Sequence, residues 1–124
     1  MMGNGPKALL LAAPRSGAGK TTVTLALIAA FRARGLSVRA AKTGPDYIDP
    51  AFHAAATAAP CPNLDPWAMS PALLEDTLHD AASGAGLLII ESAMGLLDGV
   101  GGEPIGKGSA AELAIRFRLP VLLV

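Results

Sequence analysis

A glycine-rich loop between an apolar strand and an apolar helix constrains this chain more than any other feature. Residues 13–22 read Ala-Pro-Arg-Ser-Gly-Ala-Gly-Lys-Thr-Thr, after an apolar run from Lys7 to Ala13 and before a helical segment from Thr21 to about Arg34. Glycines let the backbone curl so that N–H groups and the helix N-terminus point at phosphate oxygens. The loop is predicted to bind phosphates through Ser16, Gly17, Ala18, Gly19, Lys20, Thr21 and Thr22.

Two side chains of this loop have specific predicted roles. Lys20 would reach the β- and γ-phosphates of a nucleotide, and the Thr21 hydroxyl would bind Mg²⁺. Pro14 stands where the pattern G-x-x-x-x-G-K-[ST] has its first glycine. The alternative is an accidental glycine-rich turn, which the position between a strand and a helix disfavours.

The rest of the chain alternates further strands and helices. Strands are predicted at Ser37 to Lys42 and at Leu87 to Ile90, the second of them central because all its residues are apolar. Helices are predicted at Ala51 to Ala58, from Ser70 to about Ala82, and from Ser109 to about Phe117. This alternation indicates an α/β fold, a parallel sheet flanked by helices.

The last segment, Pro120 to Val124, is predicted to be one more buried strand. A buried strand of a parallel sheet needs a helix over it, and none follows. We therefore expect residues 1–124 to be the truncated N-terminal part of a larger domain.

Composition excludes several functional classes. Ten Lys and Arg balance 10 Asp and Glu, so the net charge of zero provides no general attraction for nucleic acid or an anionic membrane surface. No apolar stretch is long enough to span a membrane. The single cysteine, Cys61, excludes an internal disulfide framework and favours the cytoplasm.

Two further strand ends carry charged residues. Lys42 ends one strand and is followed by Asp46 and Asp49, while Glu91 ends the central strand. Carboxyl ends of parallel strands meet at one edge of the sheet, so these groups are expected beside the phosphate loop, where carboxylates could hold Mg²⁺ and Lys42 could neutralise a phosphoryl group. An Asp/Pro turn with a solvated lysine, and a surface glutamate, remain as alternatives.

Other reactive residue types are predicted to be structural. His53 and His79 lack the spacing of metal ligands and are expected on helix surfaces or at caps. Cys61 has no neighbouring histidine that would make it a nucleophile. Trp67 and Met69 are expected to pack rather than to line a ligand site.

Six segments together resemble the start of the cobyrinic acid a,c-diamide synthases, including the hydrogenobyrinic acid enzymes, which are P-loop NTPases of the dethiobiotin synthetase-like group. The segments are APRSGAGKTTVTLAL, KTGPDYIDPAFH, NLDPWAM, ESAMGLLDG, GSAAELA and PVLLV. The resemblance implies that ATP and Mg²⁺ activate the a and c carboxylates of a corrinoid precursor as acyl phosphates. Ammonia derived from glutamine then displaces phosphate.

The resemblance also implies roles for individual residues. Thr21 and Glu91 would hold Mg²⁺, and Lys42 would contact the transferred phosphate. Asp46 and Asp98 match acidic positions near the activated carboxylate, so Lys42, Asp46 and Asp98 are the catalytic candidates. Tyr47 and Ile48 match the loop that faces the tetrapyrrole.

One expected part of the family is missing, and alternatives remain. The family has a C-terminal glutaminase domain with a nucleophilic cysteine, which residues 1–124 lack, so we expect no amidating activity from them alone. Another tetrapyrrole amidotransferase or a dethiobiotin synthetase would use similar loops, and a homodimer is one expected oligomeric state. A Par/Min-type partitioning ATPase shares the fold but usually has an additional lysine early in the loop, where this chain has Arg15.

Overall fold

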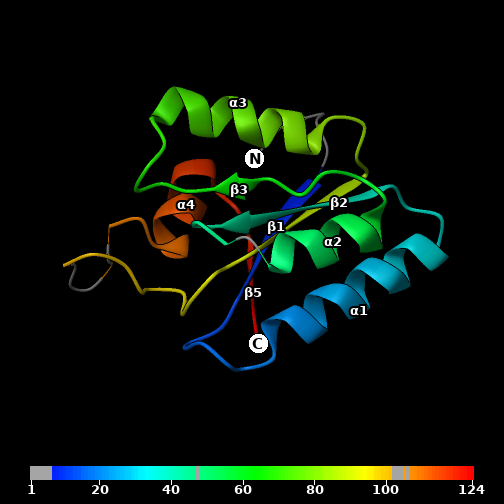
Figure 1. Cartoon of the computed structure of the whole chain (residues 1–124), viewed down its shortest axis with the longest axis horizontal. Helices are drawn as coiled ribbons and strands as arrows, with labels where there is room; N and C mark the ends of the chain where they lie inside the picture. The colour runs from blue at the N-terminus through cyan, green and yellow to red at the C-terminus, as the bar shows by residue number, and fades with distance from the viewer. Residues whose placement is uncertain (1–6, 47, 102–104, 106) are drawn as a thin grey trace.

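The computed structural model describes residues 7–46, 48–101, 105 and 107–124. Strands and helices alternate along these residues, with one helix in each crossover between consecutive strands (Figure 1). The elements are β1 Lys7–Ala12, α1 Lys20–Ala33, β2 Val38–Thr43, α2 Asp49–Thr57, β3 Asn63–Leu64, α3 Pro71–Ala82, β4 Leu87–Glu91, α4 Ala110–Phe117 and β5 Val121–Leu123. The predicted α/β class is confirmed.

The described strands form one parallel sheet in the order β3-β2-β4-β1-β5. β4 lies between β1 and β2, so its last residue, Glu91, pairs in register with Leu11 on one side and Lys42 on the other. The ends of the three central strands therefore lie together. The loops that follow them open at the same edge of the sheet.

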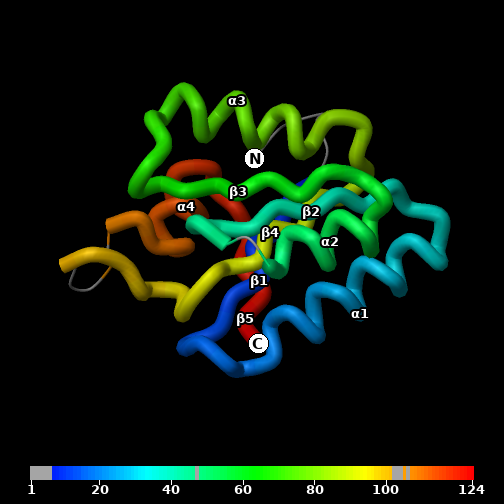
Figure 2. Tube along the Cα trace, in the orientation of Figure 1, coloured from blue at the N-terminus to red at the C-terminus, as the bar shows by residue number. Residues whose placement is uncertain are grey.

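Helices cover both faces of the sheet (Figure 2). On one face, α1 packs on the strands through Ile28 and α2 lies next to it. On the other face, α3 and α4 pack through Leu74 and Leu113. β4 contributes to both cores, with Ile89 in the first and Leu88 in the second, which confirms it as the central strand. Burial of each such aliphatic side chain stabilises the fold by about 1.5–3 kcal/mol.

Serine caps begin α3 and α4 as predicted. Ser70 Oγ accepts a hydrogen bond from Leu73 N at 3.1 Å, and Ser109 Oγ accepts one from Glu112 N at 3.2 Å. Glu112 Oε2 accepts from Gly108 N at 2.7 Å, one residue before the position that a standard capping box uses. No helix in the described part of the chain is long and apolar enough to span a membrane.

One strand of the sheet was not predicted. Asn63–Leu64 belong to none of the predicted strands and helices, but they form β3, because the backbone N–H of Lys42 reaches Pro62 O at 3.0 Å and aligns this segment with β2. β5 forms where a strand was predicted, and its side chains are partly exposed, as expected for a strand that no helix follows. It lies at the edge of the sheet with β1 as its only neighbouring strand among those described, and 40%, 44% and 57% of Val121, Leu122 and Leu123 are exposed.

Candidate active site

The phosphate loop forms the wall of a cavity at the carboxyl end of the sheet. Gly17 and Gly19 have φ of 74° and 95°, which a residue with a Cβ rarely adopts, and Lys20 begins α1 directly after them. The cavity has a volume of about 380 Å³. Its lining is Ser16, Gly17, Gly19, Lys20, Thr21, Thr22, Lys42, Asp49 and Ala93, so it brings together the predicted loop residues other than Ala18.

The loop after β4 supports the entry of the phosphate loop. Leu96 N donates to Ala13 O at 2.7 Å, which holds the two backbones side by side. A Cβ placed on Gly95 would lie 2.5 Å from Pro14 O, so only glycine permits this approach. The backbone at Pro14, which replaces the first glycine of the usual loop pattern, is therefore held in place by the loop after β4.

Lys42 is the centre of a buried ion-pair cluster. It is 2% exposed, its Nζ lies 2.7 Å from Asp49 Oδ2 and 3.6 Å from Asp46 Oδ2, and it also contacts Glu91 Oε2. Burial by itself lowers the pKa of Lys42, but the hydrogen bonds to Asp49 and Glu91 outweigh burial and raise it. The solvated-lysine alternative is therefore wrong.

Glu91 joins this cluster to the phosphate loop. Its side chain is fully buried, and Thr21 Oγ1 lies 3.0 Å from Glu91 Oε2 and 3.3 Å from Asp49 Oδ2. Burial raises the pKa of Glu91, but interactions with His53, Lys42 and Thr24 more than offset burial and hold the pKa at about 2. Glu91 is therefore ionised at neutral pH. Because it is fully buried, the alternative of a surface glutamate is wrong.

The low pKa of Glu91 predicts how stability depends on pH. Because protonation is harder in the folded state, this contribution is complete above the ordinary value of 4.5 and is lost as the pH falls toward about 2. The free energy of unfolding should decrease by about 3 kcal/mol over this interval through Glu91. Urea unfolding across the interval should show a weaker pH dependence for Glu91→Gln, and an equal dependence would contradict the assignment.

Lys20 differs from Lys42 in having no carboxylate ion-pair partner among the residues that the structure describes. It is only 6% exposed, yet it takes part in none of the ion pairs found among the described residues. Its pKa is lowered by burial and then by repulsion from Lys42, although Glu91 and Asp98 oppose this. Lys20 is therefore a buried cation placed to receive an anion.

In the loop after β2, the side chain of Asp46 holds the backbone at the start of the next helix. Asp46 Oδ1 accepts hydrogen bonds from the N–H groups of Ile48 at 2.9 Å and Asp49 at 3.2 Å, and so fixes the start of α2 two residues before the predicted Ala51. Burial raises the pKa of Asp46, but these amides and Lys42 lower it overall. Ile48 is 71% exposed, and Tyr47 lies outside the described residues.

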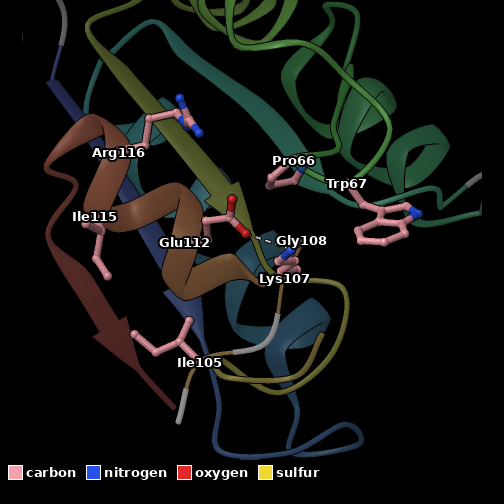
Figure 3. Close-up of a pocket in the computed structure, with 8 residues that line it drawn as sticks. All are labelled: Pro66, Trp67, Ile105, Lys107, Gly108, Glu112, Ile115 and Arg116. Atoms are coloured by element: carbon pink, nitrogen blue, oxygen red, sulfur yellow. Dashed lines mark hydrogen bonds between the residues drawn. The ribbon is translucent and has the colours of Figure 1, made fainter. Parts of the chain in front are cut away.

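Asp98 lies in a second cavity, of about 310 Å³, that shares Ala93 with the phosphate-loop cavity. Asp98 Oδ2 accepts a hydrogen bond from Gly95 N at 2.9 Å. A third cavity, of about 520 Å³, shares Trp67, Lys107 and Gly108 with the second. Figure 3 shows the third cavity between α4 and the loop that carries Pro66. The three cavities follow one another from the phosphate loop to α4.

Two residues predicted to be structural lie at these sites. His53, expected on a helix surface or at a cap, is fully buried, and its Nε2 lies 3.2 Å from Glu91 Oε1. The spacing of four residues from Asp49 puts both on one face of α2, which was the available sequence signal. Trp67, expected to pack, is 62% exposed and borders two cavities. Burial raises the pKa of Cys61 to about 12, so its thiol is protonated.

Comparisons with known proteins identify a family for the chain. The family model CbiA, described as the CobQ/CobB/MinD/ParA nucleotide binding domain, matches residues 9–100.

The chain is similar to proteins named hydrogenobyrinate a,c-diamide synthase. It is 56% identical over 118 residues to that of Agrobacterium fabrum, covering 95% of this chain and 27% of the relative. It is 53% identical over 118 residues to that of Mesorhizobium japonicum, with the same coverage. For Rhodobacter capsulatus the identity is 54% over 125 residues, covering 99% of this chain and 28% of the relative. The chain therefore spans about a quarter of the length of these curated relatives.

Proposed function

Because the chain belongs to the CobQ/CobB/MinD/ParA nucleotide-binding family, we propose that it binds ATP and Mg²⁺ and activates the a and c carboxylates of a corrinoid precursor for amidation. The observation that carries the proposal is that Lys20, Thr21 and Lys42 line one cavity, while the buried Glu91 contacts both Thr21 and Lys42. The corrinoid is inferred from the printed names of the relatives.

The phosphate loop is the proposed ATP site. The backbone of Gly17 and Gly19 and the start of α1 provide N–H groups for phosphate oxygens, and Lys20 provides the charge. Since Lys20 has no ion-pair partner in the described structure, a nucleotide would not have to displace one. The repulsion between Lys20 and Lys42 would be relieved by the anion.

The oxygen atoms near Thr21 fit a magnesium ion. Thr21 Oγ1 already lies within hydrogen-bonding distance of both Asp49 and Glu91, and such hard oxygen donors are the ligands that Mg²⁺ prefers. Among the described residues no group of three or more His, Cys, Asp and Glu could hold a metal alone, so phosphate oxygens and water would complete the shell. When bound, Mg²⁺ would neutralise charge that develops on the phosphates.

The proposed reaction is phosphoryl transfer to a carboxylate. A carboxylate oxygen of the substrate attacks the γ-phosphorus and ADP leaves, which gives an acyl phosphate. Ammonia then attacks the acyl carbon, phosphate leaves, and a proton is lost to give the amide. Lys42 would stabilise the negative charge on the transferred group, while Asp46 and Asp98 would lie near the carboxylate that is activated.

The row of cavities would have room for a large substrate. Beyond Asp98 it passes the apolar surface of Trp67 and ends beside α4, and its charged lining residues are of both signs: Lys107, Arg116, Asp65, Asp98 and Glu112. The two cationic side chains are the proposed contacts for carboxylates of the macrocycle. Ile48, which is exposed, and Tyr47 would face the macrocycle from the loop after β2.

Glutamine is the proposed source of ammonia, although its hydrolysis is not assigned to residues 1–124. A glutaminase requires an activated nucleophile such as a thiolate. Cys61, with a pKa near 12, is not one. Ammonia would therefore come from a partner domain of the kind that the resemblance implies.

A chimera tests this function directly. Residues 1–124 would replace the matching segment of the Agrobacterium fabrum synthase, to which they are 56% identical. With ATP, Mg²⁺, ammonia and a corrinoid whose a and c carboxylates carry ¹⁸O, we expect amidation with transfer of ¹⁸O into inorganic phosphate. The same chimera with Lys20→Ala is the matched control and should be inactive. Formation of AMP and pyrophosphate would contradict the acyl-phosphate route.

A further inference from the structure

The two ring nitrogens of His53 are buried polar atoms for which the described residues provide no well-formed hydrogen bond. His53 lies on α2, is fully buried, and neither ring nitrogen has a hydrogen bond of good geometry among the described residues. Glu91 Oε1 lies 3.2 Å from His53 Nε2 and likewise has no hydrogen bond of good geometry within the described part of the chain. Buried polar groups normally have partners, and an apolar residue would fill this space at lower cost. A purely structural role therefore explains His53 poorly.

The two oxygens of Glu91 face different surroundings. Oε2 is directed toward the phosphate loop, where it meets Thr21 and Lys42, whereas Oε1 is directed inward to His53. A carboxylate can only accept hydrogen bonds, so the contact is favourable when the Nε2 of His53 carries a proton. A small rotation of either side chain would complete the hydrogen bond, as often happens when a site is occupied.

We propose that His53 is a positioning residue for the magnesium site, holding Glu91 Oε1 so that Glu91 Oε2 faces Thr21 and the metal. This inference rests on the proposed function in one respect, the binding of Mg²⁺ with a nucleotide. It requires neither a corrinoid nor ammonia. Groups that orient a metal ligand in this way typically contribute 10–100-fold to metal affinity.

Three substitutions of His53 separate positioning from packing. In His53→Gln the amide nitrogen replaces Nε2, the atom that faces Glu91. In His53→Asn the amide nitrogen replaces Nδ1 instead, and His53→Leu fills the space without a donor. His79→Leu is the matched control, because His79 is exposed on α3.

The measurement is binding of a fluorescent, non-hydrolysable ATP analogue, with Mg²⁺ and with EDTA, to the chimera in which residues 1–124 replace the matching segment of the Agrobacterium fabrum synthase. The ratio of the two affinities reports the metal, and urea unfolding without ligand reports the fold. His53→Leu and His53→Asn should reduce the ratio by about 10–100-fold, whereas His53→Gln and His79→Leu should retain most of it.

Three outcomes would overturn the proposal. They are an unchanged ratio in all His53 variants, a loss in His53→Gln as large as in His53→Asn, and a wild-type affinity that does not depend on Mg²⁺. Failure of the proposed function looks different, since the chimera would then not amidate a corrinoid while the wild-type affinity ratio stayed high.

Discussion

Replacing Lys42 by methionine should lower the free energy of unfolding by about 3–5 kcal/mol, because it removes the cation from a buried ion pair. Lys42 is 2% exposed and Glu91 is fully buried, so the remaining carboxylate would have no compensating charge beside it. Methionine keeps a similar length of aliphatic chain, which limits the loss of packing. Urea unfolding at neutral pH measures the change.

A double variant identifies the cause. In Lys42→Met with Glu91→Gln both charges are absent, so the loss of stability should be smaller than for Lys42→Met alone. Lys107→Met is the surface control, since Lys107 is exposed, and should change stability by no more than about 0.5 kcal/mol. If Lys42→Met and Lys107→Met have similar stabilities, the ion-pair cluster does not stabilise the fold as argued.

Replacing Lys20 by methionine should weaken nucleotide binding but, unlike Lys42→Met, should not lower the free energy of unfolding. Affinity for ATP with Mg²⁺ should fall by about 100-fold, equivalent to about 2.8 kcal/mol, because the charge facing the phosphates is lost. Stability should stay within about 0.5 kcal/mol of wild type or rise, because no ion pair in the described residues is broken and repulsion with Lys42 disappears. Titration calorimetry and urea unfolding measure the two quantities.

Arg15→Met is the matched control for this second prediction. Arg15 belongs to the same loop but is exposed, and its guanidinium donates to Ser16 O at 3.1 Å. It does not line the phosphate-loop cavity, so its loss should weaken binding far less than the loss of Lys20. Equal losses for the two variants would mean that the loop attracts nucleotide only through its overall charge.

The family resemblance and the local patterns together predicted the fold class and most of the candidate site. Glycines followed by Lys20 and Thr21 predict a phosphate loop because positive φ and a helix N-terminus are local properties of the chain. Glu91 could also be predicted as a site residue, because its position at the end of an uninterrupted apolar strand is visible in the local sequence. The Ser70 and Ser109 caps were also readable, since each satisfies backbone groups within three residues.

Burial depended on contacts that local patterns do not contain. His53 has the polarity of a surface residue, yet the packing of α2 beside α1 places it against Glu91. Trp67 is exposed, although its Cβ and backbone lie close to Gly108.

The phosphate loop, the alternation of strands and helices, and the charged residues at the strand ends can be predicted from the amino-acid sequence alone, because each depends on neighbours in the chain. Which of these charges meet depends on the tertiary structure. Lys42 and Glu91 are adjacent because β4 lies between β1 and β2, and strand order is set by crossover connections and long-range packing. The same packing joined Asp49 to the pair and placed His53 behind it, while Lys20 was left buried with no carboxylate partner among the described residues.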